Sequence, residues 1–368
     1  MADPSIVSGP TDIVDRLQLA RTHRVGPVTY GQLIARFGGA RAALDALPDL
    51  VRKVGGQPFR PAPLGDVHRE IETVARLGAR HLFIDTADYP ALLAQLGNAP
   101  IVMIVRGDAT IWQRPAIAMV GARNASAAAG RFARQLAGEL GERGYAVVSG
   151  LARGIDTAAH SGALPHGTVG VIASGIDVAF PLENRALQEE LAEKHLLVTE
   201  YPPGTDPLAR HFPHRNRIIA GSTLGTVVVE AAPRSGSLLT AKMATDAGRE
   251  VMAVPGSPLD PRAQGCNLLI REGATLVQSA ADIVEAVGSI DPRMVRQDRR
   301  AFDGESMREP EDAERAALVS LLGPVAVPVD ELIRQSGLSA QAVALILLDL
   351  ELAGRLERHA AGRVSLAF

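Results

Sequence analysis

The sequence predicts an α/β protein with a doubly wound, mostly parallel sheet, preceded by a small all-helical domain and followed by a winged helix. Three observations support this prediction. Apolar β-rich runs alternate with helical patterns through the middle of the chain, the N-terminal part shows helical periodicity alone, and the last part combines helices with a hairpin. We therefore expect four segments, which are residues 1–62, 63–288, 289–312 and 313–368.

The N-terminal segment has apolar residues at helical spacing, as in DIVDRLQLARTHRV and TYGQLIARFGGARAALDAL, with glycines between the helical stretches. Its arginines Arg36 and Arg41 are interpreted as part of a solvated face. The stretch GQPFRPAPLGD that follows is rich in proline and glycine and cannot continue a helix. It indicates a domain boundary near Pro63.

The central segment contains nine apolar runs that we interpret as strands. Helical stretches such as ASAAAGRFARQLAGELGERG, ALQEELAEK and SLLTAKMATDAGR separate most of them. Strands that alternate with helices form a parallel sheet covered on both faces, with the ligand crevice at the carboxyl ends of the strands. The expected strands are HLFI, IVMIVRG, AIAMVG, YAVVSG, TVGVIAS, HLLVTE, TVVVEA, EVMAVPG and ATLVQ.

The C-terminal part begins with a charged stretch without periodicity, SIDPRMVRQDRRAFDGESMREPE, which we interpret as a flexible linker. A helix, a short strand, two helices joined by a Ser-Gly turn and a hairpin follow, which is the order of a winged helix. Its expected recognition helix, SAQAVALILLDLELAG, has no lysine or arginine and carries Asp349 and Glu351. We therefore expect this module to pack against protein and not to enter a DNA groove.

The composition limits the kinds of site that the chain can hold. At 368 residues it is long enough for two or three domains, and no run resembles a membrane span or a signal peptide, so we expect a soluble cytoplasmic protein. Its one cysteine, Cys266, excludes internal disulfides and thiolate metal clusters, and no cofactor is expected. With a net charge of −3, a nucleic-acid site must be a local concentration of positive charge.

Cations, amides and glycines follow several of the expected strands. A strand end that opens a helix presents backbone N–H groups, and a nearby arginine adds a charged donor, so the pattern predicts a site for phosphate. Two residues are interpreted as structural: Asp156 as a helix cap and His160 as a packing residue. Glu200 is either an acid or an anchor for its turn, and Asn184 caps a helix. The candidates are Arg123, Ser149, Gly150, Arg153, Arg215, Asn216, Arg217, Arg234, Gly236, Ser237 and Lys242.

Four ordered stretches, VVSGLARGIDTAAH, FPHRNRIIAG, VVVEAAPRSGSLLTA and GREVMAVPG, resemble the DNA-processing protein A family, also called Smf. The stretch DYPALLAQLGNAPIVMIVRGD is similar to the family's lead-in to the fold. The resemblance covers the whole central segment. It implies an extended Rossmann domain, an N-terminal sterile-alpha-motif-like domain and a C-terminal winged helix.

The resemblance also implies a function. Such proteins are non-enzymatic factors of natural transformation that bind incoming single-stranded DNA, form homodimers and help to load the RecA recombinase onto DNA that carries single-strand-binding protein. By similarity, the basic pocket includes Arg123, Ser149 with Gly150, Arg215 with Arg217, and the turn at Gly236 and Ser237, which Arg153, Arg234 and Lys242 enlarge. The chain departs from the family at Ala122, where a serine is usual, and at Ala173 and Ser174 in the third turn.

Physical arguments favour single strands over duplex. A narrow crevice built from backbone N–H groups seats a few phosphates and excludes a rigid duplex. Aromatic residues make up only 4% of the chain, so we expect weak sequence preference, with Phe180, Phe212 and Tyr201 as the available stacking platforms.

Two alternatives come from other classes of protein. A phosphoribohydrolase similar to the lysine-decarboxylase-like proteins would use Glu230, but it needs a PGGxGT turn where this chain has PRSGSLLT. A winged-helix transcription regulator would bind duplex DNA through its recognition helix. The acidic recognition helix of this chain disfavours that alternative.

Overall fold

The computed structural model describes residues 10–53, 60–288, 308, 310–359 and 362–367. The chain divides into two units, one formed by Glu72–Arg299 and the other by Met1–Ile71 together with Arg300–Phe368. Most of the linker expected at 289–312 lies outside the described residues.

The central unit is built on a nine-stranded sheet in the order β1-β2-β6-β5-β4-β3-β7-β8-β9. Each of the nine expected strands is present. Strands β3 to β9 are parallel to one another, whereas β2 runs antiparallel to both of its neighbours, β1 and β6. The strands are β1 (Ala79–Phe83), β2 (Val102–Gly107), β3 (Ala116–Val120), β4 (Ala146–Ser149), β5 (Thr168–Val171), β6 (Leu196–Thr199), β7 (Gly225–Val228), β8 (Glu250–Ala253) and β9 (Thr275–Leu276).

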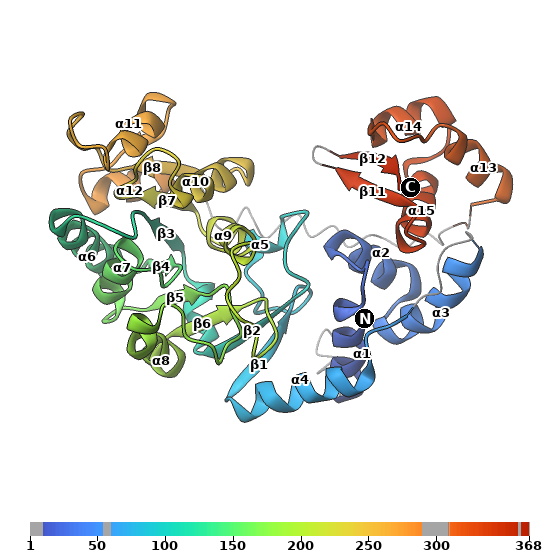
Figure 1. Ribbon diagram of the computed structural model, residues 1–368, viewed down its shortest axis with the longest axis horizontal. Helices are drawn as coiled ribbons and strands as arrows, with labels where there is room; N and C mark the ends of the chain where they lie inside the picture. The colour runs from blue at the N-terminus through green and yellow to red at the C-terminus, as the bar shows by residue number, and fades with distance from the viewer. Residues whose placement is uncertain (1–9, 54–59, 289–307, 309, 360–361, 368) are drawn as a thin grey trace. The chain divides into compact units, whose positions relative to one another are not determined.

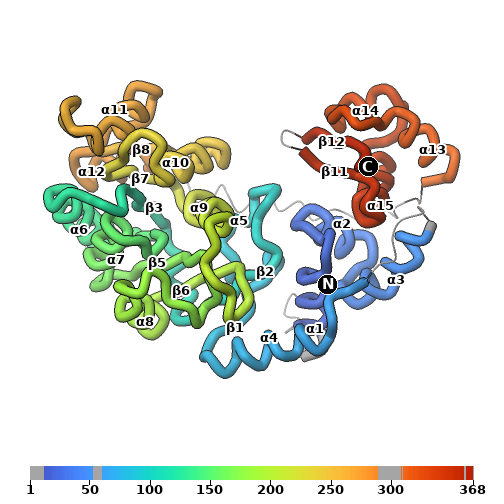
Figure 2. The backbone as a smooth tube through the Cα atoms, viewed as in Figure 1, coloured from blue at the N-terminus to red at the C-terminus, as the bar shows by residue number. Residues whose placement is uncertain are grey.

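Helices cover both faces of this sheet, which confirms the doubly wound, Rossmann-like fold (Figures 1 and 2). Because side chains alternate along a strand, Ile117 packs with the α6, α7 and α12 side, and Ala118 with the side of α9, α10 and α11. These helices are α5 (Ala91–Ala94), α6 (Ala127–Glu142), α7 (Ile155–Ala163), α8 (Arg185–Lys194), α9 (His211–Gly221), α10 (Gly236–Asp246), α11 (Gln264–Arg271) and α12 (Ala280–Gly288), with short 3-10 turns η1 (Ala109–Gln113) and η2 (Leu182–Asn184).

The order of the strands determines where a ligand can bind. From β3 the chain proceeds through β4 and β5 to β6 on one side, and it then crosses back through α9 to β7 on the other side of β3. The loops after β3 and β7 therefore diverge at the carboxyl edge of the sheet, and this switch point is the usual place for a crevice in such folds.

The second unit combines both ends of the chain. Its N-terminal part holds α1 (Pro10–Arg21), α2 (Pro27–Phe37) and α3 (Ala40–Lys53), and α4 (Leu64–Arg76) leads from it to β1. Its C-terminal part has the predicted order of a winged helix, with a sheet in the order β10-β12-β11. The C-terminal elements are α13 (Asp312–Ser320), β10 (Val327–Pro328), α14 (Val329–Ser336), α15 (Ala340–Leu352), β11 (Leu356–His359) and β12 (Arg363–Leu366).

Gly337 ends α14 with a φ of 66°, a left-handed conformation that glycine adopts without strain, and so allows the turn into α15. Within the described ranges, every helix is too short or too polar to cross a bilayer.

Candidate nucleic-acid interface

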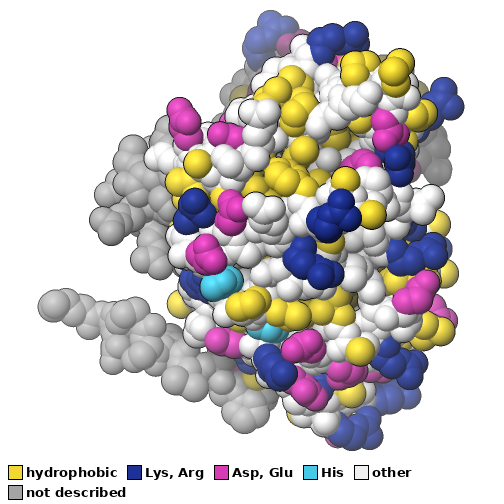
Figure 3. Space-filling view, turned by 90° about the vertical axis from the view of Figure 1, so that its left-hand side faces the viewer, with side chains coloured by type: hydrophobic (Ala, Val, Ile, Leu, Met, Phe, Trp, Pro, Cys, Tyr) yellow, Lys and Arg dark blue, Asp and Glu magenta, His cyan; other side chains and the backbone are white. Residues whose placement is uncertain are grey.

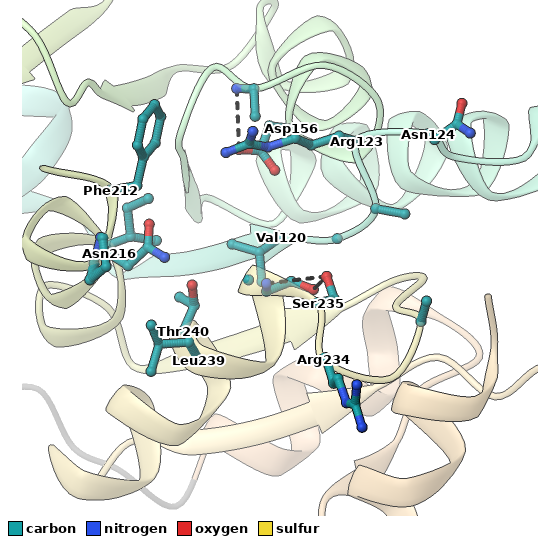
Figure 4. Close-up of a pocket in the computed structure, with 18 of the residues that line it drawn as sticks. Val120, Arg123, Asn124, Asp156, Phe212, Asn216, Arg234, Ser235, Leu239 and Thr240 are labelled. Carbon is teal, nitrogen blue, oxygen red and sulfur yellow. Dashed lines mark hydrogen bonds between the residues drawn. The ribbon is translucent and has the colours of Figure 1, made fainter. Parts of the chain in front are cut away.

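A cavity of about 790 Å³ opens at the switch point of the central sheet. Its walls come from the loops after β3, β4, β7 and β8 and from α9 and α10. The lining includes four arginines and one aspartate, so the site is cationic although the chain as a whole is slightly acidic. Figure 4 shows how its labelled side chains lie around the opening.

Two glycines allow the loops to approach each other at the floor of this cavity. A Cβ at Gly121 would lie 2.5 Å from the Ile155 side chain, and a Cβ at Gly154 would lie 2.2 Å from the Ala122 carbonyl oxygen. Gly154 also has a φ of 77°, which favours glycine. Any larger residue at either position would push the β3 loop away from α7.

Three arginines of the cavity lining are exposed, which are Arg123, Arg234 and Arg262. In the described part of the chain, neither Arg123 nor Arg234 forms an ion pair with a carboxylate. The guanidinium of Arg123 lies 5.2 Å from the ring centre of Phe212, a cation–π contact that orients it. Arg123 lies on one side of the opening and Arg234 on the other, and the Arg234 side chain is directed away from Arg123 (Figure 4). Both add positive charge to the rim of the cavity.

The N-terminus of α10 provides the backbone donors of the site. Ser235 caps the helix and its hydroxyl contacts that of Ser237 at 2.8 Å. Gly236 is exposed, and a Cβ there would meet no atom within 4 Å, so the backbone is open to a ligand. The neighbouring α6 differs, because the Ser126 N–H at its N-terminus already donates to the Glu230 carboxylate at 2.8 Å. In α10 the N–H groups of Ser237 and Leu238 donate to Ser235, so the exposed backbone at Gly236 is the part of this N-terminus that a ligand can approach.

Asp156 is the one carboxylate of the cavity lining, and it is 6% exposed. It does not cap α7, as the sequence had suggested; it accepts N–H bonds from Gly150 (3.1 Å) and Ala152 (3.3 Å) in the loop before that helix. Burial raises the pKa of this carboxyl, and the positive charges of Arg215 and Arg123 together with the two N–H bonds oppose the rise.

Arg215 lines the cavity but is only 5% exposed, and two of its guanidinium nitrogens donate to protein groups. One guanidinium nitrogen donates to the carbonyl oxygens of Gly150 and Val171, both at 2.6 Å, and Nε donates to Asn216 Oδ1 at 3.0 Å. Burial lowers its pKa to about 10, so it remains charged at neutral pH. Arg215 therefore adds positive potential to the floor, and it also connects the loops after β4 and β5.

The Ser149–Gly150 pair supports this arrangement from inside the sheet. The hydroxyl of Ser149 is fully buried and donates to the Met119 carbonyl oxygen at 2.6 Å. A Cβ at Gly150 would lie 2.0 Å from a guanidinium nitrogen of Arg215, so only glycine leaves room for that arginine. Both residues hold the neighbouring β3 and α9 elements in position, and neither lines the cavity.

Three other candidate cations lie outside the cavity lining. Arg217 donates to both oxygens of Glu200, at 2.7 and 2.6 Å, so Glu200 serves as its anchor. Arg153 is exposed and pairs with Glu183 at 3.5 Å. Lys242 lies in the second turn of α10 and is exposed. The structure thus gathers Arg123, Arg215, Asn216, Arg234, Gly236 and Ser237 from the eleven candidates.

Asn124, Thr240 and Arg262 line the cavity without having been predicted. Arg262 follows β8 and is held by Asp260 at 3.1 and 2.9 Å, with Glu230 at 4.0 Å. Arg262 follows the expected strand EVMAVPG, so the pattern of cations after strands could have identified it as well. Asn124 is adjacent to Arg123 and could have been found in the same way.

The aromatic platforms differ in how accessible they are. Phe180 is 43% exposed and its ring lies 5.8 Å from that of Phe212, which lines the cavity. Tyr201 stacks on His211 at 4.2 Å, so one face of its ring is already covered. Phe180 is therefore the most accessible ring beside the cavity, because the Phe212 ring already contacts the guanidinium groups of Arg123 and Arg215.

Two buried residues have structural roles that the sequence left open. His160 is fully buried, and burial lowers its pKa to about 3, so its ring is neutral. Its Nδ1 contacts the Thr168 hydroxyl at 2.7 Å, which confirms the packing interpretation. Asn184 precedes α8, but its side chain makes no capping bond; it donates to the Leu151 carbonyl oxygen at 2.8 Å instead.

Outside the cavity, charges of both signs are mixed. On the face of the central unit that Figure 3 shows, basic and acidic side chains are interspersed, with apolar patches between them. This distribution agrees with a local cationic site and not with a broad basic coat. Among the described residues, no three His, Cys, Asp or Glu side chains lie together as metal ligands would.

Comparison with known proteins places these features in a family. Residues 80–288 match the model described as "DNA recombination-mediator protein A", residues 10–73 match a DprA-like N-terminal HHH domain, and residues 305–362 match a DprA winged helix domain. The DNA processing protein DprA of Streptococcus pneumoniae is 44% identical over 198 residues, which are 53% of this chain and 70% of that protein.

Two of the solved structures that are similar to this chain are DNA processing proteins. The X-ray structure of the Streptococcus pneumoniae protein has a TM-score of 0.61 at 33% identity, with 73% of this chain and 95% of that chain covered. The structure of DNA processing protein A from Helicobacter pylori has a TM-score of 0.52 at 24% identity, with 57% of this chain and 96% of that chain covered. That structure was described for the single-stranded DNA binding mode of the Helicobacter pylori protein. The second likeness supports the fold alone.

Proposed function

The chain belongs to the DNA recombination-mediator protein A family, and from this premise we propose that it binds single-stranded DNA in the cavity at the strand ends. The observation that carries the proposal is the pair of exposed arginines Arg123 and Arg234, which line the cavity beside the α10 N-terminus and have no carboxylate partner among the described residues. Phosphodiester oxygens are the ligands that such an arrangement of guanidinium groups and backbone N–H groups favours.

The shape and the aromatic residues of the site favour an unpaired strand. Phe180, which is 43% exposed and lies against Phe212 of the cavity lining, offers a ring surface to bases that are free to leave a stack. A duplex keeps its bases inside and presents phosphates on a rigid cylinder, which a cavity of about 790 Å³ does not accommodate.

Fluorescence anisotropy of a labelled oligo-dT, titrated with the full chain at several salt concentrations, tests this proposal. We expect tight binding that weakens with salt, with a slope of log K against log [salt] of about −0.7 for each phosphate contacted. Unlabelled duplex of equal length should compete poorly. Equal competition by duplex, or binding that does not respond to salt, would contradict the proposed site.

We further propose that the bound strand is incoming DNA of natural transformation, that the chain protects it, and that it helps to load the RecA recombinase, also onto DNA covered by single-strand-binding protein. The family's description as a recombination mediator supports this role. The test is RecA-dependent strand exchange on covered DNA with and without the chain. A rate that is unchanged by the chain would contradict the loading role while leaving DNA binding intact.

We also propose that the chain acts as a homodimer and without catalysis. The edge strand β9 exposes Leu276, which is 44% accessible, and an unpaired apolar edge favours a second copy. Asp156, the one carboxylate of the cavity lining, already accepts two N–H bonds, which disfavours a role as general base. Light scattering tests the dimer, and release of free base from nucleoside monophosphates would revive the hydrolase alternative.

A further inference from the structure

Helix α15, the expected recognition helix of the winged helix, is buried on two flanks. Val343, Ile346 and Leu350 belong to the core of the C-terminal part, with Leu318 and Leu332. The opposite flank is buried too: Leu345 is 5% exposed, Leu348 0%, Asp349 1% and Leu352 2%. A winged helix that reads DNA leaves this outer flank free for the groove, so here something else covers it.

Asp349 identifies what covers that flank. One of its carboxylate oxygens accepts a bond from Arg36 of α2 at 3.0 Å, and the other is held by Arg315 of α13. The Arg36 side chain is 4% exposed and that of Asp349 is 1% exposed. A carboxylate is stable at such burial only when it is paired and hydrogen-bonded. Here the pairing takes one arginine from each end of the chain.

Further polar contacts continue along the same flank. Thr29 of α2 is 1% exposed and donates to Glu351 Oε2 at 3.3 Å, and the second flanking arginine, Arg24, reaches the Leu352 carbonyl oxygen at 3.5 Å. Gly354 leaves room for this arginine, because a Cβ there would lie 2.5 Å from the guanidinium carbon of Arg24. Positive and hydroxyl groups of the N-terminal part thus face the two acidic residues of α15, which has no basic residue.

We propose that the outer flank of α15 is a docking surface for a basic helical partner, and that its resident occupant is the N-terminal helical domain of the same chain. The two terminal domains are then one body, and the chain between them forms a closed loop that contains the central unit. In this state α15 does not enter a DNA groove. The winged helix acts as a clasp, by which we mean that it holds the N-terminal and C-terminal domains together. This inference does not depend on the proposed DNA site.

Cleavage of the full chain tests the clasp directly. A protease recognition sequence inserted within residues 289–307 allows the intact protein to be cut after it has folded, followed by gel filtration. We expect the C-terminal piece to remain bound to the rest of the chain. If it separates from the cut wild-type protein at micromolar concentration, the proposal is overturned.

Substitutions assign the association to the α15 flank. Arg36→Ala should weaken retention of the cut piece about a hundredfold, because removing one partner leaves part of a buried carboxylate unpaired. Arg24→Ala provides a second, milder variant of the same flank. Arg41→Ala is the matched control, since Arg41 is 66% exposed and pairs with Asp15 and Asp45 of its own domain. Equal retention by Arg36→Ala, Arg24→Ala and the control would overturn the assignment.

The oligomeric state distinguishes docking within one chain from docking between copies. If the N-terminal domain occupies α15 of its own chain, light scattering should give the same mass for the uncut wild type and for Arg36→Ala. A loss of mass in the variant would assign the occupant to a second copy and overturn the proposal. Circular dichroism of Arg36→Ala confirms that the comparison is made on folded protein.

Discussion

The cavity at the strand ends and the outer flank of α15 both gather arginines, but the two regions use them in opposite ways. At the cavity, Arg123 and Arg234 are exposed, and neither forms an ion pair within the described residues. On α15, Arg36 and Arg315 share the buried carboxylate of Asp349. The difference indicates that the first region attracts an external anion, whereas the second neutralises a charge that folding has buried.

The same contrast occurs inside the cavity itself. Arg215 donates to two carbonyl oxygens and to Asn216, so it behaves like Arg36 and Arg315, which hold Asp349, although it lines the site. Its neighbour Arg217 is committed to Glu200. An arginine therefore has to be assigned to ligand or to structure from its partners, and substitutions can separate the two roles.

The largest effect is expected for Arg215→Met, measured as the free energy of unfolding in urea. The variant leaves the carbonyl oxygens of Gly150 and Val171 without their buried donor, and we expect a loss of about 3 kcal/mol. Arg153→Met is the control, because Arg153 is exposed and should change stability by less than about 0.5 kcal/mol. A fully stable Arg215→Met would remove the distinction between structural and ligand-facing arginines.

The next effect is on binding alone. Arg123→Ala should weaken oligo-dT binding about tenfold, because a charge-assisted contact to phosphate is lost, and it should make the salt slope shallower by about 0.7. Its stability should change little, since Arg123 is exposed. Arg234→Ala should behave in the same way. Normal affinity in both variants would show that the cavity is not the DNA site.

Asp156→Asn should change oligo-dT affinity less than Arg123→Ala does, and it should strengthen binding instead of weakening it. Burial raises the pKa of Asp156 above its ordinary value of 3.8, so its carboxyl stays protonated further up the pH scale and loses its proton as the pH rises. The ionised form repels phosphate, and wild-type affinity should therefore fall as pH rises through that raised pKa. The amide removes this charge, so we expect about threefold tighter binding at pH 8 and a flatter pH profile. Anisotropy at several pH values measures both, and parallel profiles for the two proteins would refute the assignment.

The smallest effect is expected for Lys242→Ala, which should change oligo-dT affinity less than about twofold, because a solvated charge outside the cavity is screened by salt. Arg123→Ala, measured in the same titration, gives the scale for comparison. A tenfold loss in Lys242→Ala would mean that the DNA path runs beyond the cavity along α10.

The sequence alone determined the fold class, the positions of the nine central strands along the chain and the winged-helix order, because hydrophobic periodicity is a local property of the chain. It also located the edge of the sheet where the cavity lies. Only the tertiary structure decided which cations are available there, since Arg217 meets Glu200 and Arg215 meets carbonyls of distant loops. Likewise, Arg36, expected on a solvated face, is buried against Asp349, 313 residues away. Charge pairing depends on neighbours that only folding brings together, and no local pattern records them.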